Sequence, residues 1–149
     1  MTAKRILLAD DNPNDVELAL CALEELGMAD CVAVVRDGEE ALEYLRRHGA
    51  YEGREPGHPA VALLDLKMPK VSGLQVLKEV KTDPVLRSIP TVMLTSSREE
   101  RDLVESYRAG ANAYIVKPVD FERFVQSVKD IGNFWAAVNE PPPALAPSG

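Results

Sequence analysis

The stretch Ala60-Val61-Ala62-Leu63-Leu64-Asp65-Leu66-Lys67-Met68-Pro69 decides the fold of this 149-residue chain. Its apolar residues run without a break to the carboxylate of Asp65, and Pro69 and Gly73 interrupt the chain soon afterwards. Such a run between turn residues is typical of a strand buried on both faces of a parallel sheet. Ligands bind outside the carboxyl ends of these strands, where Asp65 falls. On this stretch alone, an aspartate that opens a turn or caps a helix fits equally well.

Four other short apolar runs alternate with segments of helical periodicity. These four predicted strands are Arg5–Ala9, Cys31–Val35, Thr91–Leu94 and Ala113–Val116, and the central run is a fifth. Helical periodicity follows each of them, beginning near Pro13, Asp37, Leu74, Ser97 and Asp120. Five strands that alternate with five helices predict an α/β domain, a doubly wound, flavodoxin-like three-layer sandwich. We expect its parallel five-stranded sheet to have the order 2-1-3-4-5.

Two segments between the predicted strands lead to further predictions. Residues 48–59 lack periodicity and are rich in glycine and proline, which predicts a long surface loop and the most mobile internal segment. Ser96 or Ser97 is expected to cap the fourth helix. The apolar side of that helix would consist of Leu103, Val104 and Tyr107.

The last predicted helix carries an apolar heptad pattern from its cap at Asp120 onward. Its members are Phe121, Phe124, Val128, Ile131, Trp135 and Val138. This pattern extends about two turns beyond what one domain face usually requires, so it predicts a homodimer through the last helix. Pro141-Pro142-Pro143 ends the helix, which gives a domain at residues 1–139 and a disordered proline-rich tail at residues 140–149.

Composition and charge exclude several classes of protein. The hydrophobic fraction of 46% is ordinary for a globular domain, and a net charge of −7 argues against a nucleic-acid surface. No apolar run approaches the roughly 20 residues that span a bilayer, and none near the N-terminus reaches the about 7–15 residues of a signal peptide. We therefore expect a cytoplasmic protein without a membrane partner. Cys21, Cys31, His48 and His58 have no metal-binding spacing.

Polar residues follow four of the predicted strands, and in the expected sheet they meet at one edge. Asp10 and Asp11 follow the first strand, Asp65 the third, Thr95 the fourth and Lys117 the fifth. Two charges about 4 Å apart repel by about 1 kcal/mol in water and about 4 kcal/mol at an effective dielectric of 20. Three carboxylates at one strand edge therefore need a cation, and oxygen ligands favour Mg²⁺ or Ca²⁺.

These residues also support phosphoryl chemistry. Mg²⁺ held by one or two carboxylates suits phosphoryl transfer, while a hydroxyl at Thr95 and an ammonium at Lys117 offer contacts to phosphate oxygens. A carboxylate can itself be the nucleophile and form an acyl phosphate. Taken one at a time, each feature has a plainer explanation, because Asp-Asp and Thr-Ser pairs often only cap helices. It is their joint occurrence at corresponding strand ends that points to a site.

The motifs and their order resemble the receiver domain of two-component response regulators, over roughly residues 4–138. The resemblance implies that Asp10, Asp11 and Asp65 bind Mg²⁺ together with the backbone carbonyl of Lys67. It also implies that Asp65 accepts a phosphoryl group from a sensor histidine kinase.

By the same resemblance, Lys117 binds the phosphate, and Thr95 and Tyr114 respond to phosphorylation by moving. The Lys117–Pro118 peptide would be cis, and the surface of the fourth helix, fifth strand and last helix would switch. The protein would then be a signalling switch, not an enzyme, with at most weak autophosphorylation and autodephosphorylation activity.

Finer details resemble the single-domain regulators paired with bacterial phytochromes. They are Asp10-Asp11-Asn12-Pro13-Asn14-Asp15, the long loop before the third strand, and Phe134-Trp135 in the last helix. This subgroup implies a stand-alone regulator whose kinase is a bacteriophytochrome.

Two alternatives come from other classes. A phosphatase of the haloacid-dehalogenase type also uses an aspartate nucleophile and Mg²⁺, but it places an acid two residues later, where this chain has Lys67. A flavodoxin-like binding module would need a Ser/Thr/Gly-rich phosphate loop after the first strand, where this chain has Asp10 and Asp11.

Overall fold

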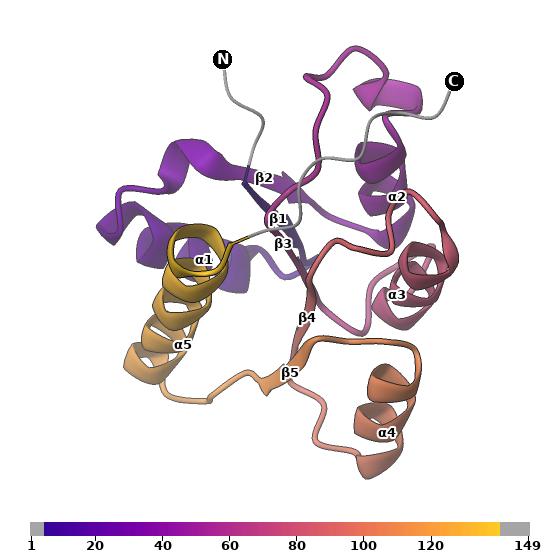
Figure 1. Cartoon of the computed structure of the whole chain (residues 1–149). Helices are drawn as coiled ribbons and strands as arrows, with labels where there is room; N and C mark the ends of the chain where they lie inside the picture. Colours follow the sequence, from indigo (N-terminus) through magenta and orange to yellow (C-terminus); the bar gives the residue numbers. More distant parts are fainter. Residues whose placement is uncertain (1–4, 141–149) are drawn as a thin grey trace.

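The computed structural model describes residues 5–140, and it contains a parallel five-stranded sheet of order β2-β1-β3-β4-β5 (Figure 1). The strands are β1 (Ile6–Ala9), β2 (Val32–Val35), β3 (Val61–Leu64), β4 (Thr91–Thr95) and β5 (Ala113–Val116). The predicted flavodoxin-like α/β fold and the predicted strand order are both confirmed. Of the expected tail at residues 140–149, residues 141–149 lie outside the described residues.

Helices cover both faces of the sheet and give the three layers (Figure 1). On one face lie α1 (Pro13–Glu25) and α5 (Phe121–Asn133), and on the other lie α2 (Gly38–Arg46), α3 (Gly73–Thr82) and α4 (Glu100–Arg108). Short 3₁₀ turns form η1 (Ala29–Cys31) and η2 (Gly49–Tyr51), and a π-helical segment forms η3 (Phe134–Val138). Within residues 5–140, no helix is long and apolar enough to cross a membrane.

The central strand β3 is buried on both faces, as its apolar sequence predicts. Val61 and Leu63 belong to the cluster under α1 and α5, whereas Ala62 and Leu64 belong to the cluster under α2 and α3. Alternate residues of a strand point to opposite faces of the sheet, so one apolar run supplies both cores. A strand of this kind cannot end on an unpaired charge inside the core, which places Asp65 at the edge of the sheet.

The pairing of β1 with β3 fixes where the strand ends meet. Ala9 lies opposite Leu64 in the register, and the amide of Asp65 donates to the carbonyl of Ala9 at 2.9 Å. Both strands therefore end at the same level, and Asp10 and Asp65 follow them side by side. This is the point where the order of the sheet reverses, with β2 on one side of β1 and β3 on the other.

The predicted heptad pattern of the last helix is divided between core and surface. Phe124, Val128 and Ile131 are buried against α1 and the sheet, but Phe121 and Val138 are 61% and 64% exposed. Gly132 allows this helix to pack closely on α1, because an added Cβ at Gly132 would lie 2.6 Å from the Leu23 side chain. A heptad pattern gives the apolar face of a helix but does not tell which turns the domain itself covers.

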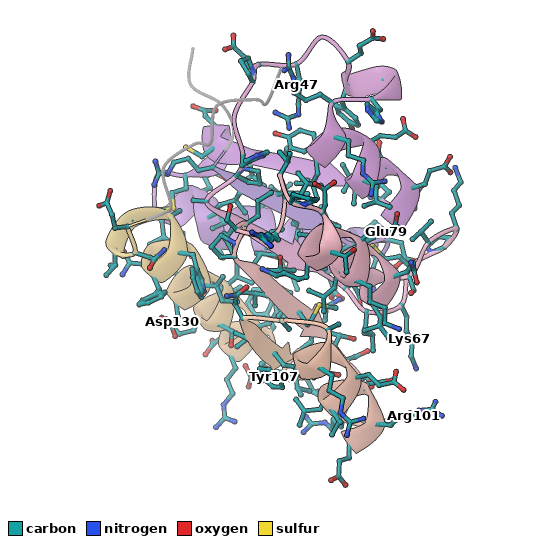
Figure 2. All side chains as sticks on the ribbon, turned by 45° about the vertical axis from the view of Figure 1, so that its right-hand side comes forward. Arg47, Lys67, Glu79, Arg101, Tyr107 and Asp130 are labelled. Carbon is teal, nitrogen blue, oxygen red and sulfur yellow. The ribbon has the colours of Figure 1, made fainter. Side chains whose placement is uncertain are left out.

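Helix α4 differs from expectation in its cap and in its buried face. Glu99 is the N-cap and makes no side-chain cap, while the hydroxyl of Ser97 donates to Asp102 at 2.5 Å. Leu103, Val104 and Tyr107 are exposed, and Ser106 is the residue of α4 that the domain buries. Tyr107, labelled in Figure 2, is 51% exposed. The three apolar residues do form one side of α4, but the domain leaves that side partly exposed.

The segment before β3 is built around Arg54 and is not an unstructured loop. The guanidinium of Arg54 donates to the carbonyls of Tyr44 at 2.7 Å and Gly57 at 3.1 Å, and it lies 4.3 Å from the centre of the Tyr44 ring. Tyr51 packs edge-on against the same ring, and its hydroxyl donates to Glu40 at 3.1 Å. Arg54 thereby joins the segment to the C-terminal end of α2, a contact that composition does not reveal.

Replacing this arginine tests whether it holds the segment in place. We expect Arg54→Ala to lower the free energy of unfolding by about 2 kcal/mol, through loss of the cation–π contact and of hydrogen bonds to carbonyls. Urea unfolding measures the change. The control is Arg47→Ala, because the Arg47 side chain is exposed and makes no ion pair or hydrogen bond within residues 5–140. Equal stability of the two variants would contradict the proposed role of Arg54.

Candidate functional site

Three carboxylates meet at the carboxyl edge of the sheet. Asp10 and Asp11 follow β1, Asp65 follows β3, and one carboxylate oxygen from each lies within 4.8 Å of the other two. Asp10 is buried, Asp65 is partly buried and Asp11 is exposed, so the cluster opens to solvent on one side. The structure thus brings together the three acidic residues that the sequence placed at corresponding strand ends.

The side chain of Lys117 reaches this cluster from the end of β5. Its ammonium nitrogen lies 2.8 Å from Asp10 Oδ2 and 3.2 Å from Asp65 Oδ2. The backbone of Lys117 is fixed by a 2.7 Å hydrogen bond from its amide to the carbonyl of Thr95 in the neighbouring strand. The lysine side chain is only 8% exposed, so its charge is held beside the carboxylates and is largely shielded from water.

A fourth carboxylate, Asp15, also binds Lys117 and was missed as a site residue by the sequence interpretation. It lies in the first turn of α1, and its Oδ2 is 2.8 Å from the ammonium nitrogen. In the sequence, Asp15 stands out only as part of a subgroup signature. One signal was available, because α1 starts at the carboxyl edge of β1 and its first turn must therefore lie beside the site.

Burial and ion pairing shift the pKa values of the two most buried groups. Burial raises the pKa of Asp10 above its ordinary value, although hydrogen bonds from Lys117 and from the amide of Asn12 oppose this effect. Burial alone would lower the pKa of Lys117, but its hydrogen bonds to Asp10 and Asp15 prevail and raise it. Lys117 is therefore a permanent cation, and it faces four carboxylates.

This excess of negative charge and the all-oxygen donor set fit a divalent cation. Hard cations such as Mg²⁺ and Ca²⁺ take carboxylate and carbonyl oxygens, and Mg²⁺ is commonly held by one or two carboxylates with water in its other positions. Asp10, Asp11 and Asp65 would supply the carboxylates. The amide of Lys67 lies 3.4 Å from Asp65 Oδ1, and its side chain is exposed (Figure 2). A metal contact from the Lys67 carbonyl stays a prediction.

The two residues expected to respond to phosphorylation meet at the connection between β4 and α4. Thr95 is buried at the end of β4, and its Oγ1 accepts from the amide of Ser97 at 3.3 Å. The hydroxyl of Tyr114 donates to the carbonyl of Ser97 at 3.1 Å, and burial raises the pKa of Tyr114. Ser97 therefore links a hydroxyl beside the site to an aromatic ring on β5.

The peptide bond between Lys117 and Pro118 is trans, and the expectation of a cis bond is wrong. That expectation came from resemblance alone, whereas the general preference before proline is trans by about 0.5–1 kcal/mol. The ion pairs of Lys117 form with the trans bond in place.

Comparison with known proteins gives a consistent result. The family model of the response regulator receiver domain matches residues 6–129. The probable methanogenesis regulatory protein FilR2 of Methanothrix harundinacea (strain 6Ac) is 40% identical over 92% of this chain and 86% of its own. Response regulator Rcp1 of Synechocystis sp. (strain ATCC 27184 / PCC 6803 / Kazusa) is 36% identical over 89% of this chain and 88% of its own.

Solved structures show the same similarity. The phosphorylated cyanobacterial phytochrome response regulator RcpA matches with a TM-score of 0.87 and 40% identity, over 95% of this chain and 99% of that one. The Mn²⁺-bound form of Rcp1 matches with a TM-score of 0.82 and 34% identity, over 92% and 97%. The bacteriophytochrome response regulator RtBRR matches with a TM-score of 0.75 and 57% identity, over 96% and 86%.

Removing the cation of the cluster tests its electrostatic role. Lys117→Met leaves the buried carboxylate of Asp10 without its counter-charge, and we expect it to lower the free energy of unfolding by about 3 kcal/mol in the presence of a chelator. Lys129→Met is the control, because Lys129 makes a more exposed pair with Glu25 at 3.7 Å and should contribute under about 1 kcal/mol. Equal losses in urea unfolding would show that the cluster does not depend on Lys117.

Proposed function

The chain belongs to the response regulator receiver domain family, and from this premise we propose that Asp65 accepts a phosphoryl group and thereby switches the protein between two signalling states. The observation that carries this proposal is the convergence of Asp10, Asp11, Asp65 and Lys117 at one edge of the sheet. The protein acts as a signalling switch and has at most weak autophosphorylation and autodephosphorylation activity. It works in the cytoplasm.

Of the two clustered carboxylates that Lys117 binds, Asp65 is the freer to act as a nucleophile. Both oxygens of Asp10 are engaged, Oδ1 by the amide of Asn12 at 2.9 Å and Oδ2 by Lys117 at 2.8 Å. Asp65 is held more loosely, with its Oδ1 at 3.4 Å from the amide of Lys67 and its Oδ2 at 3.2 Å from Lys117. It is also more exposed than Asp10, which allows a phosphodonor to approach.

The chemistry requires two sources of positive charge. Mg²⁺, when bound, would neutralise charge on the transferring phosphoryl oxygens, and Asp10, Asp11 and Asp65 would hold it. A solved relative, Rcp1, has a Mn²⁺-bound form, and this supports the binding of a divalent ion by this chain. Lys117 supplies the second charge from the protein itself. An oxygen of Asp65 forms the new bond to phosphorus while the bond to the donor breaks in line with it.

The proposed phosphodonor is the phosphohistidine of a sensor histidine kinase. We infer that this kinase is a bacteriophytochrome, because RcpA, a cyanobacterial phytochrome response regulator, and RtBRR, a bacteriophytochrome response regulator, are similar along nearly the whole chain. Identity to RtBRR is 57%, higher than the 40% to FilR2, which is named for methanogenesis. The bond from histidine nitrogen to phosphorus breaks as Asp65 attacks, and the imidazole is the leaving group.

The proposed switch runs from Asp65 to the surface of α4, β5 and α5. A phosphoryl oxygen on Asp65 offers the hydroxyl of Thr95 a partner, and a movement of this side chain toward it would take away the oxygen to which the amide of Ser97 donates. Ser97 is also bound by Tyr114, so a shift in this connection changes the position of the tyrosine ring. The open apolar side of α4 lies directly beyond this connection and would change with it.

We also infer a homodimer that forms through the region of the last helix. Phe134 and Val138 at its end are 48% and 64% exposed, and Leu103 and Tyr107 on α4 are exposed as well. Exposed apolar residues of this kind are a common feature of interfaces between copies of a chain.

Phosphoryl uptake tests the proposed acceptor. With Mg²⁺ and a phosphorylated bacteriophytochrome or a small acyl phosphate, the wild type should gain one phosphoryl group that hydroxylamine removes, because an acyl phosphate is sensitive to hydroxylamine. Asp65→Asn should gain none. Asp130→Asn, at an exposed carboxylate of α5, should behave as the wild type. Uptake by Asp65→Asn at the wild-type level, measured by intact mass, would refute the proposal.

Sedimentation at micromolar concentration tests the dimer. We expect the wild type to be dimeric and Val138→Glu to be monomeric, because a carboxylate in an apolar interface loses its hydration. Val119→Glu should stay dimeric, since Val119 is fully exposed in the connection before α5 and lies outside the last helix. A wild type that remains monomeric with and without phosphorylation would count against the interface.

A further inference from the structure

Lys117 has three partners for three donor hydrogens. A lysine ammonium carries three hydrogens, and the carboxylates of Asp10, Asp15 and Asp65 lie at 2.8, 2.8 and 3.2 Å from its nitrogen. Its donors are therefore fully used within the cluster. A phosphoryl group on Asp65 must therefore compete for the ammonium with the carboxylates of Asp10 and Asp15, because the carboxylate of Asp65 itself loses its negative charge when it forms the acyl phosphate.

Asp15 differs from the other two partners because it lies outside the group of carboxylates that could hold a metal ion. Asp10 and Asp65 both belong to the group of carboxylates whose oxygens lie within 4.8 Å of one another, and Asp15 does not. A divalent cation would take oxygens of Asp10 and Asp65 as ligands. The carboxylate of Asp15 would keep Lys117 as its partner. Asp15 is thus a dedicated partner of the ammonium.

The first turn of α1 fixes the backbone of Asp15 beside Lys117. Its amide donates to the capping side chain of Asn12 at 3.2 Å, and a carboxylate in the first turn of a helix is stabilised by the helix dipole. The ammonium lies closer to Asp10 and Asp15 than to Asp65. Two carboxylates on the β1 and α1 side therefore hold the ammonium more tightly than Asp65 does.

We propose that Asp15 is a positioning residue that restrains the Lys117 ammonium and releases it when a phosphoryl group on Asp65 competes for it. This inference rests on the proposed function, in which Asp65 carries the phosphoryl group. Of the two partners that stay carboxylates when Asp65 carries the phosphoryl group, Asp15 is the one that can be released, because its side chain is 25% exposed and water can replace the lost bond. Asp10, at 3% exposure, has almost no access to water that could replace its bond to Lys117.

Binding of beryllofluoride, a mimic of the acyl phosphate, measures this restraint. In saturating Mg²⁺, calorimetric titration should show Asp15→Asn binding beryllofluoride about three- to tenfold more tightly than the wild type, because a neutral amide competes less strongly for the ammonium than a carboxylate does. Asp15→Glu keeps the charge and should restore an affinity near that of the wild type.

The control is Glu17→Gln, which removes one carboxylate from the same helix. Glu17 is exposed and makes no ion pair within residues 5–140, so its affinity for beryllofluoride should equal that of the wild type. Unchanged or weaker binding by Asp15→Asn would overturn the inference.

A crystal structure of the wild type with Mg²⁺ and beryllofluoride separates release from simple charge repulsion. We expect Lys117 to contact the beryllofluoride and to lie beyond about 3.5 Å from Asp15, outside hydrogen-bond range. A retained bond between Lys117 and Asp15 in that complex would overturn the inference even if Asp15→Asn binds more tightly. Failure of the wild type to bind beryllofluoride at all would instead refute the proposed function, and the inference with it.

Discussion

One ammonium among four carboxylates is the constraint on which the rest of this structure depends. Lys117 balances only part of the negative charge that Asp10, Asp11, Asp15 and Asp65 bring to the carboxyl edge of the sheet. Such an arrangement persists only where the backbone holds the groups together. Here β1 and β3 are neighbours in register, α1 begins directly after β1, and Lys117 is fixed by the ladder between β4 and β5. The unbalanced charge is what makes the site suitable for a divalent ion and a phosphoryl group.

Much of this arrangement could be predicted from the sequence, because strand ends in a parallel sheet have a fixed direction. The apolar run at residues 60–64 required a strand buried on both faces, and the structure shows two cores that share β3. Once the strand order was expected, residues that follow the strands had to meet at one edge. Asp10, Asp65 and Lys117 were found on that basis, and none of the three needed a detailed model of side-chain packing.

The features that the sequence did not predict all depend on side-chain geometry or on what covers a surface. Asp15 and Arg54 act through single long-range contacts that leave no periodic pattern. The apolar residues of α4 follow a helical pattern, but the pattern cannot tell whether the sheet or another partner covers them. The trans peptide before Pro118 shows that a resemblance can carry a local detail that the chain itself does not adopt.

The most direct test of this account is thermal unfolding of the wild-type protein with a chelator and with increasing Mg²⁺. If the three carboxylates bind one divalent ion in the folded state alone, Mg²⁺ at about 100 times its Kd should add about 2.7 kcal/mol to the free energy of unfolding. For a domain of this size, that corresponds to a rise in Tm of roughly 5–10 °C. A Tm that is the same in chelator and in millimolar Mg²⁺ would contradict the account.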